Sequence, residues 1–198
     1  MTKKVIIATR NQGKAKEFQN MFAPHGYEVQ TLLDMPQIDD VEETGTTFEE
    51  NAILKAETVA KELGVLVIAD DSGLAIDALE GRPGVYSARY AGEEKNDEAN
   101  MDKVLAELKD VPGGERNARF HCVLAIAGPH METRTVNGTC EGQILQERRG
   151  SNGFGYDPIF FIPSLGRSMA ELTQEEKSRI SHRGNALEKL RPMIKDFD

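Results

Sequence analysis

Short apolar runs alternate along the chain with longer stretches in which apolar residues recur at helical spacing. Runs of strand length predict buried strands over residues 4–8 and 65–69, the second rich in β-branched residues. Between them, apolar positions at i, i+4 and i+7 predict a helix over about 14–22, ended by Pro24 and Gly26. The first third of the chain therefore has the strand and helix order typical of α/β folds.

A second helix is predicted to start near Thr47 and to stop at Gly64. The pairs Thr46–Glu49 and Thr47–Glu50 at its start both have the spacing of a capping box. The side chains expected to face the core form one stripe at helical spacing: Phe48, Ala52, Ala56, Val59 and Leu63.

The rest of the chain predicts shorter elements. A third helix is expected over residues 96–108 and a helical tail over 173–197, broken around 181–184. Strands are expected at 119–127, 133–136, 143–146 and 157–162. Strands that alternate with helices at both ends, with a strand pair in the middle, predict an α/β fold with a mixed sheet.

Length and composition indicate an ordinary globular protein. The 198 residues suit one large domain or two small lobes, and 39% are hydrophobic and 29% charged. No apolar run approaches the roughly 20 residues of a membrane span. The N-terminus turns polar within a few residues, so we expect no signal peptide. Together these features predict a cytoplasmic protein.

The cysteines and the net charge indicate where the protein is located and what it is not expected to bind. Two cysteines, Cys122 and Cys140, in a chain of this size indicate reduced thiols and a cytosolic location. The formal net charge of −9 argues against broad binding to nucleic acids or to anionic membranes. It leaves room for a local anion site.

The segment from Thr9 to Lys14 lies between the first predicted strand and helix. A helix N-terminus offers unpaired N–H groups and a positive dipole end, and both favour a phosphate. Lys14 adds a mobile positive charge. The segment is not a Walker A loop, because Ala15 stands where a Ser or Thr would hold the metal. A plain strand–helix turn remains the alternative.

Lys55 occupies an unexpected place on the second predicted helix. It follows Phe48 by seven residues, so it lies in the apolar stripe, one turn after Asn51. Burying an unpaired ammonium costs several kcal/mol. Lys55 must therefore snorkel to solvent, pair with an acid, or line an anion-binding cleft.

The sequence from Ala69 to Gly73 places two adjacent acids directly after a predicted buried strand. Ligands of open α/β sheets bind beyond the carboxyl ends of strands, and carboxylates suit a hard cation. Because strand residues alternate between faces, only one of Asp70 and Asp71 is expected to face a ligand. The pair Glu42–Glu43 could supply a second metal carboxylate. A solvated turn is the alternative for residues 70–73.

Two later segments could recognise a base. In Gly150 to Pro158, glycines flank Phe154 and leave its ring accessible for stacking, although the segment taken alone favours a hairpin turn with a core phenylalanine. Near the break in the helical tail, Arg183 carries a fork of donors that suits a purine O6. His182 could be a cap or a core residue.

Other chemistries find no support in the sequence. There is no Ser/His/Asp triad, zinc-type Cys/His spacing or dinucleotide-binding glycine motif. His121 and Cys122 alternate within a predicted strand, and we interpret both as structural.

In this order, the motifs resemble those of the inosine/xanthosine triphosphate pyrophosphatase family over nearly the whole chain. The matching stretches are T-x-N-x-G-K at 9–14, E-E-T-G-x-T-F-x-E-N-A-x-x-K-A at 42–56, A-D-D-S-G-L at 69–74, G-x-P-G-V-Y-S-A-R-Y at 81–90, R-F-H-C at 119–122, G-F-G-Y-D-P at 153–158 and L-T-x-E-E-K-x-x-I-S-H-R at 172–183. One departure is Arg10, which stands where this family often has glycine.

The resemblance implies an elongated mixed sheet flanked by helices, in a single domain of residues 1–198 with two lobes around a central cleft. It implies a homodimer that uses Mg²⁺ to hydrolyse ITP, dITP and XTP to the monophosphate and pyrophosphate, clearing deaminated purines from the nucleotide pool. A non-catalytic nucleotide-binding protein and a hydrolase with another substrate are the alternatives.

Site residues follow by matching position. Asp71 is the implied catalytic residue and a metal ligand, and Glu42 is a further metal ligand. The implied substrate-binding residues are Thr9, Arg10, Asn11, Gln12, Gly13, Lys14, Lys55, Ser72, Phe154, Gly155, Tyr156, Asp157, Lys177, His182 and Arg183. We expect Lys14, Lys55 and Lys177 to form, with Mg²⁺, a local positive pocket for the triphosphate.

Overall fold

The computed structural model describes residues 3–195. Its strands are β1 (Lys3–Ile7), β2 (Tyr27–Thr31), β3 (Val67–Ile76), β4 (Asn117–Ala127), β5 (Arg134–Ile144), β6 (Phe160–Ile162) and β7 (Arg167–Ser168). Its α-helices are α1 (Gln12–Phe22), α2 (Phe48–Leu63), α3 (Asp97–Glu107), α4 (Gln174–Ile180) and α5 (His182–Lys195).

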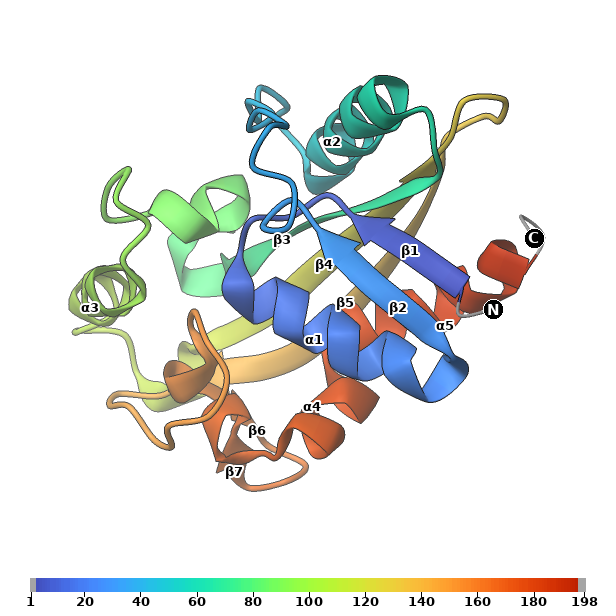
Figure 1. The fold of residues 1–198 in the computed structure, drawn as a ribbon. Coiled ribbons are helices and arrows are strands. Elements are labelled where there is room, and N and C mark those ends of the chain that lie inside the picture. Colours follow the sequence, from blue (N-terminus) through green and yellow to red (C-terminus); the bar gives the residue numbers. More distant parts are fainter. Residues whose placement is uncertain (1–2, 196–198) are drawn as a thin grey trace. The chain divides into compact units, whose positions relative to one another are not determined.

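The strands form one seven-stranded sheet in the order β2-β1-β3-β4-β5-β6-β7 (Figure 1). Strand β1 pairs in parallel with both β2 and β3, whereas β6 pairs antiparallel with β5 and β7. The sheet is therefore mixed, and the predicted α/β class is confirmed.

Local signals define the ends of the first two helices. Asn11 caps α1, and its side-chain oxygen accepts from the backbone N of Lys14 at 2.9 Å. Thr47 caps α2 in a reciprocal capping box with Glu50, as one of the two predicted pairs required. Gly64 ends α2 at φ 66°, a left-handed conformation that glycine adopts without strain.

The largest difference from expectation is in β3. This strand continues to Ile76, so Asp70, Asp71 and Ser72 lie inside it. The predicted end of the strand at residue 69 is therefore wrong, and the alternative of a solvated turn at residues 70–73 is not observed. Two acids can lie within a buried strand because each has cationic partners. The two side chains lie on opposite faces of the strand: that of Asp70 contacts residues of α1 and α5, whereas that of Asp71 contacts α2.

Strand β5 merges the two strands predicted at 133–136 and 143–146. Glycines and polar residues in the middle of β5 interrupt the alternation of apolar and polar positions that predicts a strand. Gly142 is required there, because a Cβ atom would lie 2.5 Å from the carbonyl oxygen of Phe161. In the segment predicted as a strand over 157–162, residues Asp157–Ile159 instead form a short 3₁₀ helix, with Pro158 in its first turn.

Other boundaries differ less. The break in the helical tail is confined to Ser181, whose φ of −69° and ψ of 157° are extended. The sequence pattern did not reveal β2 or β7. Residues 196–197 of the predicted tail helix lie outside the described residues.

The chain divides into two compact units. Of the described residues, the first unit contains 3–71, 122–138 and 183–195, and the second contains 72–121 and 139–182.

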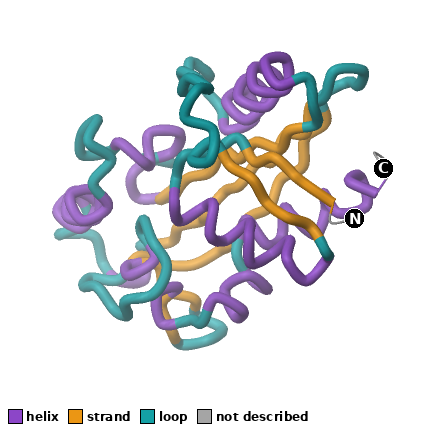
Figure 2. Tube along the Cα trace, in the orientation of Figure 1, coloured by secondary structure: helices purple, strands orange, loops and turns teal. Residues whose placement is uncertain are grey.

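In the first unit, different helices cover the two faces of the sheet (Figures 1 and 2). Helices α1 and α5 pack on one face, through side chains such as Phe18 and Leu190, against Ile68 and Leu124. Helix α2 packs its alanines and Val59 on the other face. The predicted stripe of α2 thus faces the core.

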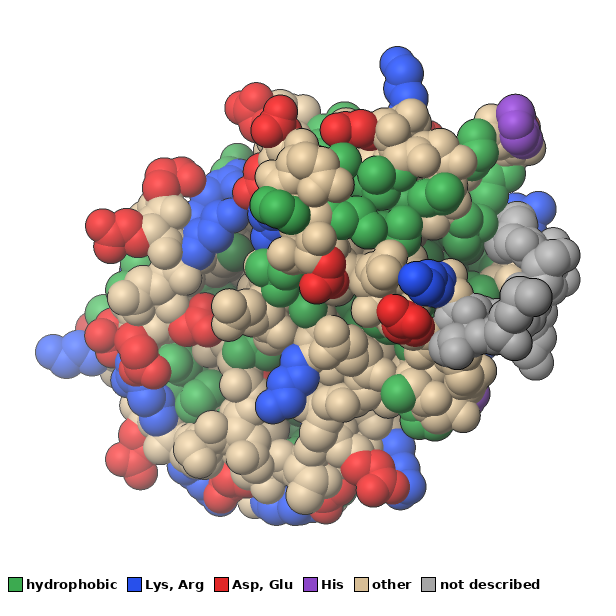
Figure 3. All heavy atoms as spheres, in the orientation of Figure 1, with side chains coloured by type: hydrophobic (Ala, Val, Ile, Leu, Met, Phe, Trp, Pro, Cys, Tyr) green, Lys and Arg blue, Asp and Glu red, His purple; other side chains and the backbone are tan. Residues whose placement is uncertain are grey.

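The second unit has its own core, formed by the far halves of β3, β4 and β5 together with α3 and β6. The buried side chains include Leu74, Met101, Phe120, Ile144 and Phe160. Between residues 3 and 195, no helix is both long and apolar enough to cross a membrane. On the face drawn in Figure 3, acidic and basic side chains are interspersed.

Candidate functional site

The loop between β1 and α1 is held by its own polar side chains. Thr9 is buried, and its hydroxyl oxygen accepts from the backbone N of Asn11 at 3.1 Å. Asn11 in turn caps α1, whose first turn, beginning at Gln12 and Gly13, contains no acidic residue. The positive end of the helix dipole is therefore not neutralised by its own sequence, as an anion site requires.

Arg10 is held by the loop that follows β2. Its guanidinium donates to the carbonyl oxygen of Leu32 at 2.8 Å and to that of Ile38, and it lies 3.2 Å from a carboxylate oxygen of Asp40. In this structure Arg10 therefore orders the loop of residues 32–40. Its predicted role in substrate binding has no counterpart in these contacts.

Asp70 is the centre of a buried ion cluster in the first unit. Its Oδ1 lies 2.5 Å from Lys14 Nζ, and its Oδ2 accepts from Arg183 Nε at 2.8 Å and from Cys122 Sγ at 3.2 Å. Burial alone would raise the pKa of Asp70, but Arg183 and Lys14 outweigh burial and hold it well below the usual value.

Arg183 is almost fully buried, with 1% of its side chain exposed, and it is bonded to Glu17 as well as to Asp70. Burial works to lower the pKa of Arg183, but the two carboxylates raise it overall. Glu17 was not among the predicted site residues, because nothing in the sequence connects an acid in α1 with a residue so far along the chain.

Lys55 lies on the other face of the sheet, beside Asp71. Its Nζ donates to Glu43 Oε1 at 2.8 Å, to the carbonyl oxygen of Asp70 at 2.7 Å and to Asp71 Oδ1 at 3.2 Å. Of the three alternatives for this lysine, pairing with acids is the one observed. Burial lowers the pKa of Lys55, but Asp71 and Glu43 raise it overall.

Asp71 has the features of a cation ligand. Its Oδ2 is buried without a hydrogen-bond partner in the described part of the chain. Burial raises the pKa of Asp71, although Lys55 and Lys14 oppose this. A buried carboxylate oxygen without a partner suits a hard cation such as Mg²⁺.

Few other protein ligands are available near it. Within residues 3–195, no group of three or more His, Cys, Asp or Glu side chains is placed to hold a metal ion. Glu42 is exposed, and it is Glu43 that reaches Lys55 beside Asp71.

The second unit groups another part of the predicted set around a buried ion pair. Lys177 Nζ lies 2.5 Å from Asp157 Oδ2, and both side chains are at most 4% exposed. The same oxygen accepts from the backbone N of Phe154 at 3.1 Å. The lysine ammonium also lies 4.8 Å from the centre of the Phe154 ring. Phe154 is thus held over a cation, which differs from the alternative of a simple core residue.

The neighbours of this pair are fixed as well. Gly155 donates from its backbone N to Asp97 at 2.9 Å, and the Tyr156 hydroxyl donates to the carbonyl oxygen of Ser87 at 2.6 Å. His182 is buried and stacks on Phe120, with ring centres 4.7 Å apart. Ser72 is half-buried within β3.

The expectation of a positive pocket needs correction. Lys14 is paired with Asp70, Lys55 with Glu43 and Asp71, and Lys177 with Asp157. An uncompensated buried ammonium is costly, so each lysine has recruited a carboxylate. Three lysines face four carboxylates in these contacts, so no lysine of the set carries an uncompensated charge.

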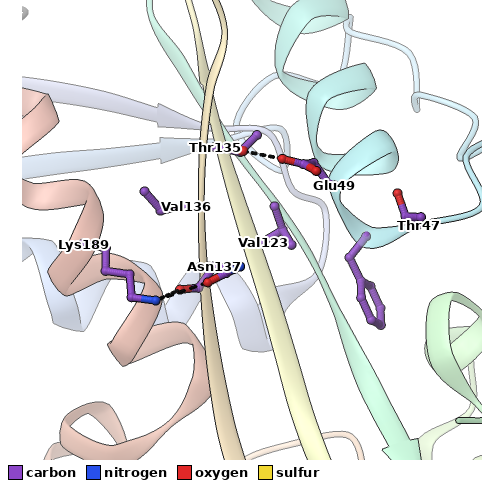
Figure 4. Close-up of a pocket in the computed structure, with 8 residues that line it drawn as sticks. Thr47, Glu49, Val123, Thr135, Val136, Asn137 and Lys189 are labelled. Carbon is purple, nitrogen blue, oxygen red and sulfur yellow. Dashed lines mark hydrogen bonds between the residues drawn. The ribbon is translucent and has the colours of Figure 1, made fainter.

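A cavity of about 490 Å³ lies elsewhere in the first unit (Figure 4). It is lined by Thr47, Phe48, Glu49, Val123, Thr135, Val136, Asn137 and Lys189. Dashed lines in Figure 4 mark the bonds from Thr135 to Glu49 and from Lys189 to Asn137. None of the residues predicted to bind substrate lines this cavity, so it does not belong to the candidate site.

A mixed α/β sheet, a helix N-terminus without acids and a carboxylate–lysine cluster are features common in α/β proteins that bind anionic ligands. Comparison with known proteins makes this specific. The model of the Ham1 family matches residues 5–193, and the chain belongs to this family.

The similar proteins match almost end to end. A dITP/XTP pyrophosphatase from Bacillus licheniformis is 58% identical over 192 residues, which cover 97% of this chain and 98% of that protein. One from Bacillus subtilis is 57% identical, covering 97% of each chain. The structure of the Staphylococcus aureus Ham1 protein is similar with a TM-score of 0.86 and 49% identity, over 99% of this chain and 100% of that one.

Proposed function

We propose that this protein hydrolyses non-standard purine nucleoside triphosphates, namely dITP, ITP and XTP, to the nucleoside monophosphate and pyrophosphate. The family and the names of its near-full-length relatives support this activity. The observation that carries it is the buried Oδ2 of Asp71, which has no hydrogen-bond partner in residues 3–195 and lies in the same unit as Lys14 and Lys55.

In the proposed reaction, a water oxygen forms a bond to the α-phosphorus while the bond between that phosphorus and the bridging oxygen breaks. The electron pair leaves with pyrophosphate. We assign to Asp71 the task of orienting the attacking water and accepting its proton. Mg²⁺, held by Asp71 and Glu42, would supply positive charge against the phosphate oxygens.

The phosphates would be bound by the N–H groups at the start of α1 and by Lys14, of whose side chain 16% is exposed. A lysine ammonium has three N–H donors, so Lys14 can keep one on Asp70 and direct others to phosphate. Lys55, bonded to Asp71, would hold the carboxylate in place while the reaction proceeds.

For the base, we propose that Arg183 faces the purine O6 and that the segment from Phe154 to Asp157 and residues Lys177 and His182 contribute contacts. Donors aimed at O6 reject adenine, whose amino group would leave them unpaired, a mismatch worth about 1–3 kcal/mol. Two carboxylates fix the guanidinium of Arg183, and this rigidity supports a reading role.

A panel of nucleoside triphosphates with Mg²⁺, scored separately for pyrophosphate and orthophosphate, tests the proposal. We expect pyrophosphate from dITP, ITP and XTP and little turnover of the standard nucleotides. Binding of ITP without pyrophosphate release would indicate a sensing protein, and orthophosphate release would indicate a different hydrolase.

We also propose that the protein is a cytoplasmic homodimer that binds neither nucleic acid nor membranes. The net charge of −9 supports the absence of polyanion binding. Light scattering after size-exclusion chromatography should give twice the chain mass of 21.9 kDa. A single-chain mass at micromolar concentration would contradict the dimer.

A further inference from the structure

Three cations assigned to the substrate or to Asp71 converge on one residue, Asp70. Lys14 contacts its Oδ1 at 2.5 Å, and Arg183 donates to its Oδ2 at 2.8 Å. Lys55 donates to its backbone carbonyl oxygen at 2.7 Å. These partners come from α1, α5 and α2, so Asp70 connects three helices of the first unit.

Asp70 is not assigned a direct substrate contact, because protein donors already occupy both of its side-chain oxygens. Its side chain is 0% exposed, on the face of β3 opposite to that of Asp71. The residue with the unpartnered oxygen is Asp71, whereas both oxygens of Asp70 are used by protein donors. Any effect of Asp70 on the reaction must therefore act through the cations that it holds.

The two side-chain oxygens of Asp70 bind different cations. Oδ1 is directed to an ammonium, which retains further donors, and Oδ2 is directed to the Nε of a guanidinium. Because Arg183 also donates from Nη1 to Glu17, the plane of its guanidinium is fixed at two points. A rigid donor plane is what discrimination between an O6 acceptor and an amino group requires.

We propose that Asp70 is a positioning residue that orients Lys14 and Arg183 together, so that turnover and base selection both depend on one buried carboxylate. The inference rests on the proposed function for the roles of Lys14 and Arg183. A change at Asp70 should therefore alter both the rate of triphosphate hydrolysis and the choice of base, although Asp70 contacts neither the phosphates nor the base.

The variant Asp70→Asn distinguishes the orientation of Lys14 and Arg183 from the electrostatic attraction of the site for phosphate. It removes a negative charge, so inorganic tripolyphosphate should bind at least as tightly as to the wild type. With Lys14 and Arg183 no longer oriented, kcat for ITP should fall by about tenfold or more. The preference for ITP over ATP, measured as kcat/KM, should fall by about tenfold, which corresponds to about 1.4 kcal/mol.

Two further variants serve as controls. Asp70→Glu restores a carboxylate and should recover part of the lost turnover and preference. Cys122→Ala removes another donor to the same oxygen of Asp70, from a buried residue that has no assigned role in the reaction. It should change thermal stability while leaving kcat and the ITP/ATP preference within about twofold of the wild type.

The outcomes distinguish this inference from the proposed function. If the wild type releases no pyrophosphate, the function fails, and the ratio of dissociation constants for ITP and ATP still tests Asp70 by calorimetry. Asp70→Asn with unchanged kcat and unchanged preference would overturn the inference. So would a variant that loses tripolyphosphate binding together with turnover, because that pattern indicates a purely structural role.

A measurement on the wild type covers the case in which Asp70→Asn does not fold. The Arg183 Nε–H resonance, assigned by its loss in Arg183→Lys, should stay protected from solvent exchange in both the free and the ITP-bound protein. Loss of that protection on ITP binding would show that Arg183 leaves Asp70, and the inference would be wrong.

Discussion

Arg183 Nε donates to Asp70 Oδ2 across 113 residues of sequence, and Nη1 of the same guanidinium donates to Glu17 across 166 residues. One side chain at the start of α5 thereby connects α1 with the part of β3 that belongs to the first unit. All three side chains are at most 3% exposed, so this cluster replaces water with protein partners. Its stability depends on every member being present.

Arg183→Met should therefore lower the free energy of unfolding by about 3–5 kcal/mol, because it removes the guanidinium from buried Glu17 and one of two cations from buried Asp70. Urea denaturation measures the change. Arg179→Ala is the matched control, since Arg179 pairs with Glu175 at the surface, with side chains 73% and 75% exposed. The control should change stability by less than about 1 kcal/mol. Equal effects of the two variants would contradict a buried cluster.

Asp71→Asn should reduce pyrophosphate release from ITP by roughly 10²-fold or more, because an amide cannot accept the proton of the attacking water. The fold should be retained, since Asp71 Oδ2 has no hydrogen-bond partner among residues 3–195 to lose, and Lys55, which is bonded to Oδ1, keeps Glu43 as a carboxylate partner. Asp77→Asn, at a carboxylate with 52% of its side chain exposed, is the control and should keep wild-type turnover. Substantial turnover by the Asp71 variant would remove Asp71 from the catalytic role.

Glu42 and Glu43 offer a direct comparison of neighbouring acids. As the second metal ligand, Glu42 should matter for the cation: Glu42→Gln should raise the Mg²⁺ concentration for half-maximal rate severalfold and leave stability unchanged. Glu43→Gln should instead disturb Lys55, its partner at 2.8 Å. A Mg²⁺ titration of the rate measures both. A shift confined to Glu43→Gln would identify Glu43, not Glu42, as the ligand.

Gly153 and Gly155 form a matched pair beside Asp157. Both have positive φ, 74° and 61°, so either alanine substitution carries a backbone penalty of about 1 kcal/mol. Only at Gly153 would the added Cβ meet the carboxylate, 2.0 Å from Asp157 Oδ2, whereas nothing lies within 4 Å at Gly155. Gly153→Ala should therefore destabilise more than Gly155→Ala in thermal melts. Equal melting temperatures would indicate that the Asp157–Lys177 pair moves freely.

Signals carried by neighbouring residues made part of the site predictable from the sequence. The Thr47 capping box and the opposite faces of Asp70 and Asp71 follow from local periodicity and were confirmed. The sequence also indicated that Lys55 needs a partner, since it lies within an apolar stripe, but it did not indicate which acid. The sequence did not predict the full length of β3, because adjacent acids are typical of turns. They lie within a buried strand here only because cations from other segments pair with them.

Long-range partner choice was beyond the sequence. Lys177 was expected to meet phosphate, yet it lies 2.5 Å from Asp157. Glu17 and Asp70 were not selected, although both hold Arg183. Burial selects such pairs only after tertiary packing brings distant segments together, because the cost of an unpaired charge depends on its surroundings. The spacing of residues along the sequence does not show which charged residues tertiary packing will bring together.

The two thiols, both free and buried, predict a pH dependence of stability. Burial raises the pKa of Cys140 from 9.0 to about 11, with Glu141 adding to the effect, and it raises that of Cys122 well above 9.0. A group with a raised pKa binds its proton more tightly in the folded chain. Its stabilising effect is therefore complete below pH 9 and is lost as the pH rises toward 11.

The test is a difference between variants, because subtracting the two free energies isolates the contribution of Cys140. The free energy of unfolding of the wild type, minus that of Cys140→Ala, should decrease between pH 9 and pH 11. Alkylation of Cys140 by iodoacetamide should likewise be slow at pH 8, because the thiolate is the reactive species. A difference that stays constant with pH, or fast alkylation at pH 8, would mean that the Cys140 thiol titrates as if exposed.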